Sequence, residues 1–89
     1  KKRNINTAIV GSGGMGMGQI LARKVEDKIP EINVTSVLPA NSAHLIDEDQ
    51  YDLVITTISK LKISHPYVAY TTPIVSQQDV YRIQKNAIR

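Results

Sequence analysis

Cysteine, phenylalanine and tryptophan are all absent from this sequence. Without cysteine, the chain has no disulfide bond, no thiolate metal site and no thiol catalysis. Without Phe and Trp, its Ile, Val and Leu residues must fill the hydrophobic core, with four Tyr near the edge of that core. The 89 residues suffice for one small domain with a single core, so we expect residues 1–89 to form one domain.

Long apolar runs and a strong excess of one charge are also lacking. Eleven basic residues oppose eight acidic ones, and Lys1, Lys2 and Arg3 supply much of the difference. The basic residues are scattered and no aromatic residues lie between them, so we expect no direct contact with nucleic acid. No segment approaches membrane-spanning length and there is no signal-peptide pattern, so we expect no membrane contact and a cytoplasmic location.

The two histidines, His44 and His65, are far apart in sequence and lack the spacing of metal ligands. We expect them to be surface or boundary residues, and we expect neither a metal nor a cofactor. The chain begins with Lys1 and not with Met, which favours a piece of a longer protein.

The order of apolar patterns predicts β-α-β-(α)-β-β-α. Short β-branched runs predict strands, and apolar residues repeating about every four positions predict helices. The strands are expected over Ile5–Val10, Ile32–Leu38, Tyr51–Ile58 and Tyr67–Thr72, and the helices over about Met17–Lys28, over Ala43–Ile46 and after Pro73. The alternation favours an α/β fold: a three-layer sandwich with a four-stranded, mainly parallel sheet and a Rossmann-like topology.

Several local signals define the helices. The stripe of Met17, Leu21 and Val25, with Ile20 beside it, predicts the buried face of the first helix. Asn41 and Ser42 are expected to cap the short second helix. In the last helix Ser76 and Asp79 have the spacing of a capping box, ahead of an apolar stripe of Val80, Ile83, Ala87 and Ile88.

The stretch "AIVGSGGMGMGQIL" contains all five glycines of the chain. It follows the first predicted strand and leads into a helix, at the sheet edge where ligands of parallel sheets bind. Backbone N–H groups there can form an anion-binding nest. With no Lys or Arg in the turn, we expect binding to be weak. The predicted phosphate loop consists of Gly11, Ser12, Gly13, Gly14, Met15, Gly16, Met17 and Gly18.

Gly18 stands out in this turn because glycine inside a helix costs about 1 kcal/mol relative to alanine. That cost predicts a close backbone approach or a special dihedral angle at position 18. Met15 and Met17, which flank Gly16, are expected to be packing or turn residues and not ligands.

A dinucleotide-binding fragment is one interpretation of the turn. Gly11, Gly13 and Gly16 fit the spacing G-x-G-x-x-G between a strand and a helix. The second strand, however, should end in an acidic residue for the ribose, and "NVTSVLPANS" has neither an acidic residue nor an Arg.

The chain also resembles the EIIB domains of the bacterial sugar phosphotransferase system, and is closest to those in transcriptional regulators and antiterminators with PTS regulation domains (PRDs). The resemblance covers nearly all of residues 5–88. It rests on four stretches in the family's order: "IVGSGGMGMGQILARKV", "PEINVTSV", "YDLVITTI" and "YVAYTTPIVSQQDVYRI".

In that family the first strand ends in a cysteine that accepts a phosphoryl group from a phosphohistidine of EIIA. After two intervening residues, the family motif continues with Gly, Ile or Met, Gly and two hydroxyl residues. Here Gly14, Met15 and Gly16 match its centre, but Gly11 replaces the cysteine, and Met17 and Gly18 replace the hydroxyl pair.

The resemblance therefore implies a regulatory EIIB-like domain of a sugar-responsive transcriptional regulator, with no catalytic residue. The implied partners are EIIA or other phosphotransferase-system proteins and other domains of the same chain, and a homodimer is compatible with this interpretation. The alternatives are a stand-alone EIIB component of a sugar phosphotransferase system and the dinucleotide-binding fragment.

Overall fold

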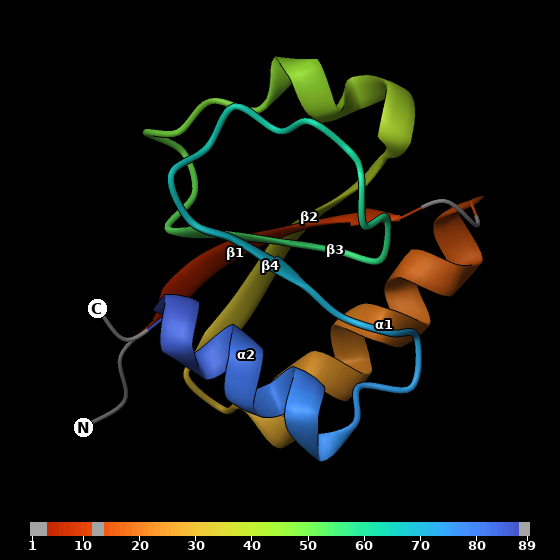
Figure 1. Ribbon diagram of the computed structural model, residues 1–89, viewed down its shortest axis with the longest axis vertical. Coiled ribbons are helices and arrows are strands. Elements are labelled where there is room, and N and C mark those ends of the chain that lie inside the picture. Colours follow the sequence, from red (N-terminus) through yellow and green to blue (C-terminus); the bar gives the residue numbers. More distant parts are fainter. Residues whose placement is uncertain (1–3, 12–13, 88–89) are drawn as a thin grey trace.

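The computed structural model describes residues 4–11 and 14–87 (Figure 1). Four strands, two α-helices and one 3₁₀-helix follow one another in the predicted order. The strands are β1 (Ile5–Gly11), β2 (Ile32–Pro39), β3 (Leu53–Thr56) and β4 (Val68–Tyr70), and the helices are α1 (Gly14–Lys28), η1 (Ala40–Leu45) and α2 (Gln77–Ala87).

The four strands form one sheet in the order β2-β1-β3-β4, and every neighbouring pair is parallel. In the central strand β1, Ile9 pairs with Val37 of β2 on one side and with Ile55 of β3 on the other. The predicted α/β fold is confirmed, and the sheet predicted to be mainly parallel is parallel throughout.

The sheet separates two hydrophobic cores, which makes the molecule a three-layer sandwich. Helices α1 and α2 cover one face, and η1 with the loop of residues 57–67 covers the other (Figure 1). Successive residues of a strand point to opposite faces. Accordingly Ile9 and Ile55 enter the core under α1 and α2, while Val10 and Val54 enter the core under η1.

β3 is shorter than the expected strand Tyr51–Ile58. All four of its residues are buried, as its β-branched composition predicts for a strand covered on both faces. The strand ends because the Thr56 hydroxyl accepts a hydrogen bond from the N–H of Ile58 at 3.0 Å, which turns the chain away. Tyr51 precedes the strand, and its hydroxyl donates to Ser36 Oγ at 2.7 Å.

The outer strand β4 is likewise shorter than expected. It spans Val68–Tyr70, and these three residues pair with β3. The connection between these two parallel strands, residues 57–67, contains no helix. His65 fixes this connection. Its Nδ1 accepts the N–H of Tyr67 at 3.0 Å, so its Nε2 carries the proton that is donated to the carbonyl of Tyr51 at 2.8 Å.

Two expectations about the helices are wrong. η1 has Pro39 at its N-cap and no side-chain cap, so Asn41 and Ser42 lie within the helix and not ahead of it. In α1, Leu21 and Val25 are buried, but Met17 and Ile20 are 52% and 56% exposed. In this part of α1 the residue that packs on the sheet is the buried Gly18, next to Val37 of β2.

The start of α2 has the capping box that its sequence predicts. The Ser76 hydroxyl accepts the N–H of Asp79, and the Asp79 carboxylate accepts the N–H of Ser76, which is the reciprocal bonding of a capping box. Ile83 and Ala87 are buried and Val80 is half-buried, as the predicted stripe requires. The remaining stripe residue, Ile88, lies outside the described residues.

Candidate functional site at the carboxyl edge of the sheet

The glycine turn joins β1 to α1 at the carboxyl end of a central strand. β1 ends at Gly11 and α1 begins at Gly14. Ser12 and Gly13, and the side chain of Met15, lie outside the described residues. The anion-binding nest, which depends on the backbone of Ser12 and Gly13, therefore stays a prediction.

α1 begins three residues before the start expected near Met17. The first N–H groups of an α-helix have no acceptor inside the helix, and here they include those of Gly14, Met15 and Gly16. Helix geometry pairs the N–H of Gly18 with the carbonyl of Gly14, one turn back. The predicted donors thus include N–H groups of the first turn, which have no acceptor inside the helix, and that of Gly18, which bonds within the helix.

Gly18 has a packing role instead. A Cβ atom at this position would overlap Cγ1 of Val37, which lies in β2. The predicted close approach of the backbone is confirmed, because only a residue without a side chain lets α1 lie this close to β2. At Gly16, by contrast, a Cβ atom would meet nothing within 4 Å.

Gly11 occupies the position at which the resemblance places a cysteine. It is half-buried and pairs with Pro39 at the end of β2. A Cβ atom at Gly11 would also meet nothing within 4 Å. A side chain at this position would therefore project into open space beside the start of α1, where a nucleophile would be accessible to a partner.

A pocket of about 190 Å³ opens beside Gly11. The carboxyl ends of β1 and β3, the first turns of α1 and the loop between β4 and α2 form its walls. The lining residues are Gly11, Met17, Gly18, Ile20, Leu21, Lys24, Thr57, Pro73 and Ile74. The β1–α1 segment, the end of β3 and the β4–α2 loop are far apart in sequence, and they meet at the carboxyl edge of the sheet.

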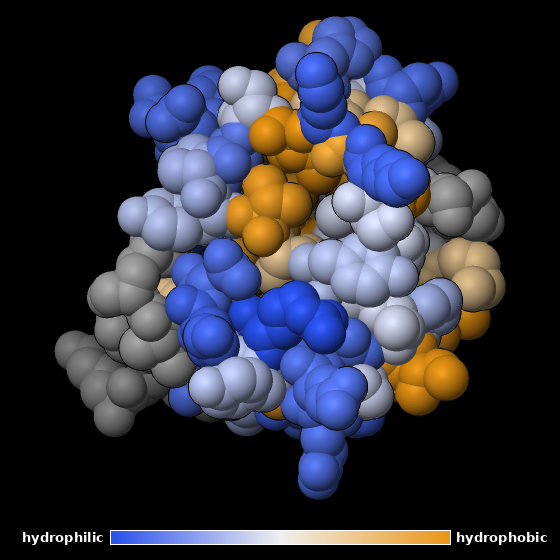
Figure 2. Space-filling model, in the orientation of Figure 1, coloured by the Kyte–Doolittle hydropathy of each residue, from blue (hydrophilic) through white to orange (hydrophobic). Residues whose placement is uncertain are grey.

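Three of the lining residues form an exposed apolar patch, which we term the carboxyl-edge patch: Met17, Ile20 and Ile74. Ile74 is 71% exposed, and the other two are more than half exposed. Figure 2 shows apolar side chains at the surface on the lower right, where α1 and the β4–α2 loop lie. Large apolar side chains grouped at the surface are typical of binding sites.

The loop between β4 and α2 is held in place from α1. Lys28 Nζ donates to the carbonyl of Val75 at 2.6 Å, and Lys24 Nζ donates to the carbonyl of Pro73 at 3.3 Å. Val75 has a φ angle of 55°, in the left-handed region that β-branched residues rarely adopt. Its side chain is fully buried in the core, which maintains this strained conformation.

Asp79 anchors the same loop from α2. Its carboxylate accepts hydrogen bonds from the Thr72 hydroxyl, from Ser76 and from Arg82, whose Nη1 lies 2.7 Å from Oδ1. Burial alone would raise the pKa of Asp79, but the hydrogen bonds from Thr72, Arg82 and Ser76 outweigh it and hold this pKa well below its usual range. Asp79 therefore acts as a charged structural anchor beneath the pocket wall.

Among the described lining residues, the side chains that carry heteroatoms other than sulfur are Lys24 and Thr57. A threonine hydroxyl becomes a nucleophile only next to a general base, and the described lining contains no His, Asp or Glu. The sulfur atom of this described lining is the thioether of Met17. This lining is suited to binding an apolar group.

The sequence singled out the glycine turn but missed the opposite wall of the pocket. Thr57 directly follows β3, and Pro73 and Ile74 follow β4 by a few residues. The rule that pointed to Gly11, that ligands bind beyond the carboxyl ends of parallel strands, also applies to these residues. Applied to all the predicted strands, it would have found this wall.

Neither histidine lies in the pocket lining. His44 is exposed in η1, and His65 uses both ring nitrogens to hold the 57–67 connection. Within residues 4–11 and 14–87, no group of three or more His, Cys, Asp or Glu side chains is placed to hold a metal ion. Over the same residues, no helix has the length and apolar character needed to cross a membrane.

Comparison with known proteins gives no match for this chain among family models, curated proteins or solved structures. The functional interpretation therefore depends on the residues and their geometry. The main features are the position of Gly11, the pocket beside it and the exposed patch on its rim.

Proposed function

We propose that this chain is a regulatory EIIB-like domain of a sugar-responsive transcriptional regulator, in which Gly11 replaces the phosphorylated cysteine. The position of Gly11 carries the proposal: it is the last residue of a central parallel strand, next to a pocket and ahead of a helix. The fold is of the class that the resemblance implies, a four-stranded parallel sheet between two layers.

The absence of the cysteine supports a regulatory domain over a transferase. Phosphoryl transfer to the end of β1 needs a thiolate or another activated heteroatom, and Gly11 has no side chain. The family's hydroxyl pair is also replaced, by Met17 and by Gly18, whose backbone packs on β2. The chain then keeps a docking surface and loses the transfer step.

The carboxyl-edge patch is where we expect a partner to bind. Met17, Ile20 and Ile74 are exposed around the position that a phosphoryl donor would have to approach. An EIIA protein, another phosphotransferase-system protein or another domain of the same regulator would cover this patch. Contacts with DNA or RNA would be made by other parts of the regulator.

Incubation with radiolabelled, phosphorylated EIIA proteins tests the proposal, with a cysteine-bearing EIIB domain as the positive control. We expect no label on the wild-type chain, and we expect label on the Gly11→Cys variant because a Cβ atom at position 11 meets no neighbour. Gly16→Cys is the matched control, since it adds an equally unhindered thiol at the wrong position.

Each outcome of this experiment has a distinct meaning. Label on the wild-type chain would overturn the proposal in favour of a working EIIB component. Equal label on both cysteine variants would mean nonspecific thiol chemistry. If the positive control is labelled but Gly11→Cys is not, position 11 does not correspond to the family's cysteine and the proposal fails.

The geometry weakens the dinucleotide alternative. The glycine that packs closely against a strand is Gly18, which lies outside the fingerprint, whereas the last fingerprint glycine, Gly16, is unhindered. β2 ends at Pro39 and continues directly into η1, with no acidic side chain at the strand end. Heat released on calorimetric titration with NAD(H) or NADP(H) at millimolar concentration would revive this alternative.

A further inference from the structure

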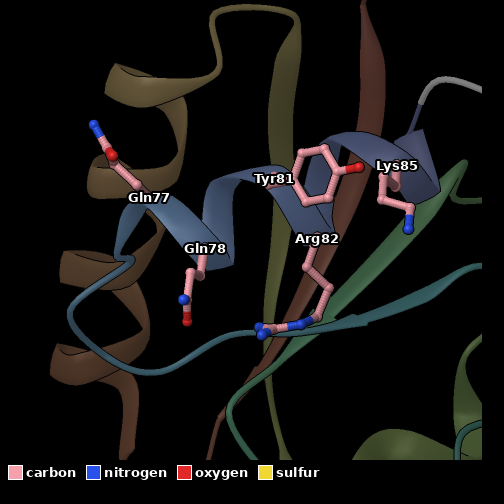
Figure 3. A pocket seen from close by; sticks show the side chains of 5 residues that line it. All are labelled: Gln77, Gln78, Tyr81, Arg82 and Lys85. Carbon is pink, nitrogen blue, oxygen red and sulfur yellow. The ribbon is translucent and has the colours of Figure 1, made fainter.

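The outer side of α2 forms a second surface, which the carboxyl-edge pocket does not use. It is a shallow depression of about 490 Å³ (Figure 3). Positions 77, 81 and 85, and positions 78 and 82, are four residues apart and therefore share one side of the helix. Ile83 and Ala87 lie on the buried side. The residues lining the depression are Gln77, Gln78, Tyr81, Arg82 and Lys85.

Among residues 4–11 and 14–87, those that line this depression are cationic or neutral and none is acidic. Arg82 and Lys85 are both on it, and the other members are two amides and a tyrosine. The acidic residue of α2 is Asp79, which is only 2% exposed and is bonded to Ser76 and Arg82. The negative charge of Asp79 is therefore buried, and the charges exposed on this face are positive. An anionic partner would be complementary to them.

The guanidinium of Arg82 is held in a fixed position. Its Nη1 donates to Asp79 Oδ1 at 2.7 Å and to the carbonyl of Tyr70 at 3.0 Å, and the side chain is 43% exposed. The guanidinium has five donors in a planar arrangement. Within the described part of the chain, those on Nη2 and Nε make no hydrogen bond, so they can bind a carboxylate without the cost of ordering the arginine.

Two tyrosines accompany these cations. Lys85 Nζ lies 5.2 Å from the centroid of the Tyr81 ring, and the Arg82 guanidinium carbon lies 5.9 Å from that of Tyr70. Tyr81 is 64% exposed. In Figure 3 the Tyr81 ring and the Lys85 side chain lie together toward the C-terminal end of the helix. Tyrosine and arginine are the residues most enriched among those that dominate binding energy at protein interfaces.

We propose that the outer face of α2 binds an acidic segment of a protein partner. The partner's carboxylates pair with Arg82 and Lys85, and its apolar atoms cover the ring of Tyr81. A nucleic acid fits less well, because its affinity comes from many phosphate contacts and this face supplies two cations. The proposal does not depend on the function of the carboxyl-edge site.

Nuclear magnetic resonance titration of the ¹⁵N-labelled chain tests whether the outer face of α2 binds an acidic segment. The probe is a capped peptide with the repeat Glu-Asp-Leu, and the control peptide has Gln and Asn in place of its acids. We expect backbone amide shifts concentrated in residues 77–85 with the acidic peptide and none with the neutral one. The effect should weaken as salt is added, because the contact is charge-based.

Matched charge variants define the contact. Lys85→Glu should weaken peptide binding by about fivefold or more, whereas Lys60→Glu, the same change at an exposed lysine after β3, should alter it by less than about twofold. Tyr81→Ala should also weaken binding without changing net charge. Lys85 and Tyr81 are both exposed, so these variants should keep the wild-type thermal unfolding temperature.

Three results would overturn the proposal. The first is an acidic peptide that leaves residues 77–85 unshifted or is unaffected by Lys85→Glu. The second is a ten-nucleotide oligothymidine that shifts residues 77–85 at lower concentration than the peptide does. The third is a concentration-dependent shift of α2 without any peptide. If neutralising Asp47, Glu48 and Asp49, the exposed acidic run after η1, removes this shift, the occupant is a second copy of the chain.

Discussion

Asp79 shows how much of this structure can depend on one side chain. Its buried carboxylate joins the loop after β4, through Thr72 and Ser76, to the second turn of α2, through Arg82. Burying a charge is costly unless hydrogen bonds compensate for it, and here they outweigh the cost, so the pKa of Asp79 is lowered. The β4–α2 loop, which forms one wall of the carboxyl-edge pocket, is therefore held in place by the ionised carboxylate of Asp79.

We predict that the free energy of unfolding falls in acid partly because of Asp79. An unfolded aspartate has a pKa of about 3.9. Because the folded pKa is lower, the unfolded chain takes up this proton first as the pH falls. The stabilisation is fully present above about pH 4–5 and is lost progressively below that, which urea unfolding at a series of pH values will measure.

The Asp79→Asn variant provides the comparison. It should be less stable by about 2 kcal/mol at neutral pH, since it loses the charged bond to Arg82 and weakens the capping box. It should also lose less stability than the wild type between about pH 5 and pH 2. Parallel pH curves for the two proteins, with Asn at the exposed Asp27 as control, would contradict the role of Asp79.

At the scale of elements, the position of α1 over β2 depends on Gly18. The helix passes so close to the strand that a methyl group at position 18 would overlap Val37. Valine is stiff about χ1, so it cannot move aside freely. This close packing fixes where the first turn of α1, with its free N–H groups, lies relative to the end of β1.

We predict opposite effects for alanine at two glycines of α1. Gly16→Ala should stabilise the protein by up to about 1 kcal/mol, because helix propensity improves and no atom is in the way. Gly18→Ala should destabilise it by about 1 kcal/mol, because overpacking against Val37 outweighs the same gain. Urea unfolding of both variants measures the difference.

A double variant identifies the cause. When Val37→Ala is combined with Gly18→Ala, the overlap disappears, so the double variant should be more stable than the sum of the two single effects predicts. Additive effects would show that Gly18→Ala acts through the helix itself and not through its contact with β2.

At the scale of the whole molecule, the strand order gives the sheet a protected centre. β1 and β3 are central, and their residues Ala8–Val10 and Leu53–Ile55 are almost entirely inaccessible to solvent. β2 and β4 form the edges, and β4 has only three residues. The central strands contribute side chains to both hydrophobic cores, so local opening should be rarest there.

Native-state hydrogen exchange should follow this order. We expect the slowest amide exchange at Ile9 and Ile55, whose exchange should need global unfolding, and faster exchange by at least about tenfold in β4 and in η1. The measurement is an exchange series by nuclear magnetic resonance at constant pH. Protection in β4 equal to that in β1 would indicate that the short edge strand is covered by another element or by a second copy.

The local pattern at the start of α2 predicts its structure correctly, because the decisive contact spans a few residues. Ser76 and Asp79 are three positions apart, so the capping box of α2 follows from the sequence. The buried strand around Leu53–Thr56 follows from its β-branched composition. The expected length of that strand was wrong, because its pairing with β1 and β4 covers only Leu53–Thr56 and the N–H of Ile58 bonds to the Thr56 hydroxyl.

Exposure at the sheet edge could not be read from a pattern. Met17 continues the apolar stripe of Leu21 and Val25, yet it is exposed, because the residue of this turn that packs on β2 is its neighbour Gly18. The left-handed conformation of Val75 gives no signal in the sequence either, since it is imposed by the burial of its side chain and by the bond from Lys28.

The sequence by itself determined the absence of thiol chemistry and the layered α/β class. The lack of cysteine and the glycine at position 11 are covalent facts, and strand and helix periods are set by each residue's near neighbours. Only the tertiary structure decided that Gly11, Thr57 and Ile74 surround one pocket and that α2 turns a cationic face outward. Those arrangements depend on which strands pair and on how closely a helix packs, and such long-range contacts have no fixed spacing along the chain.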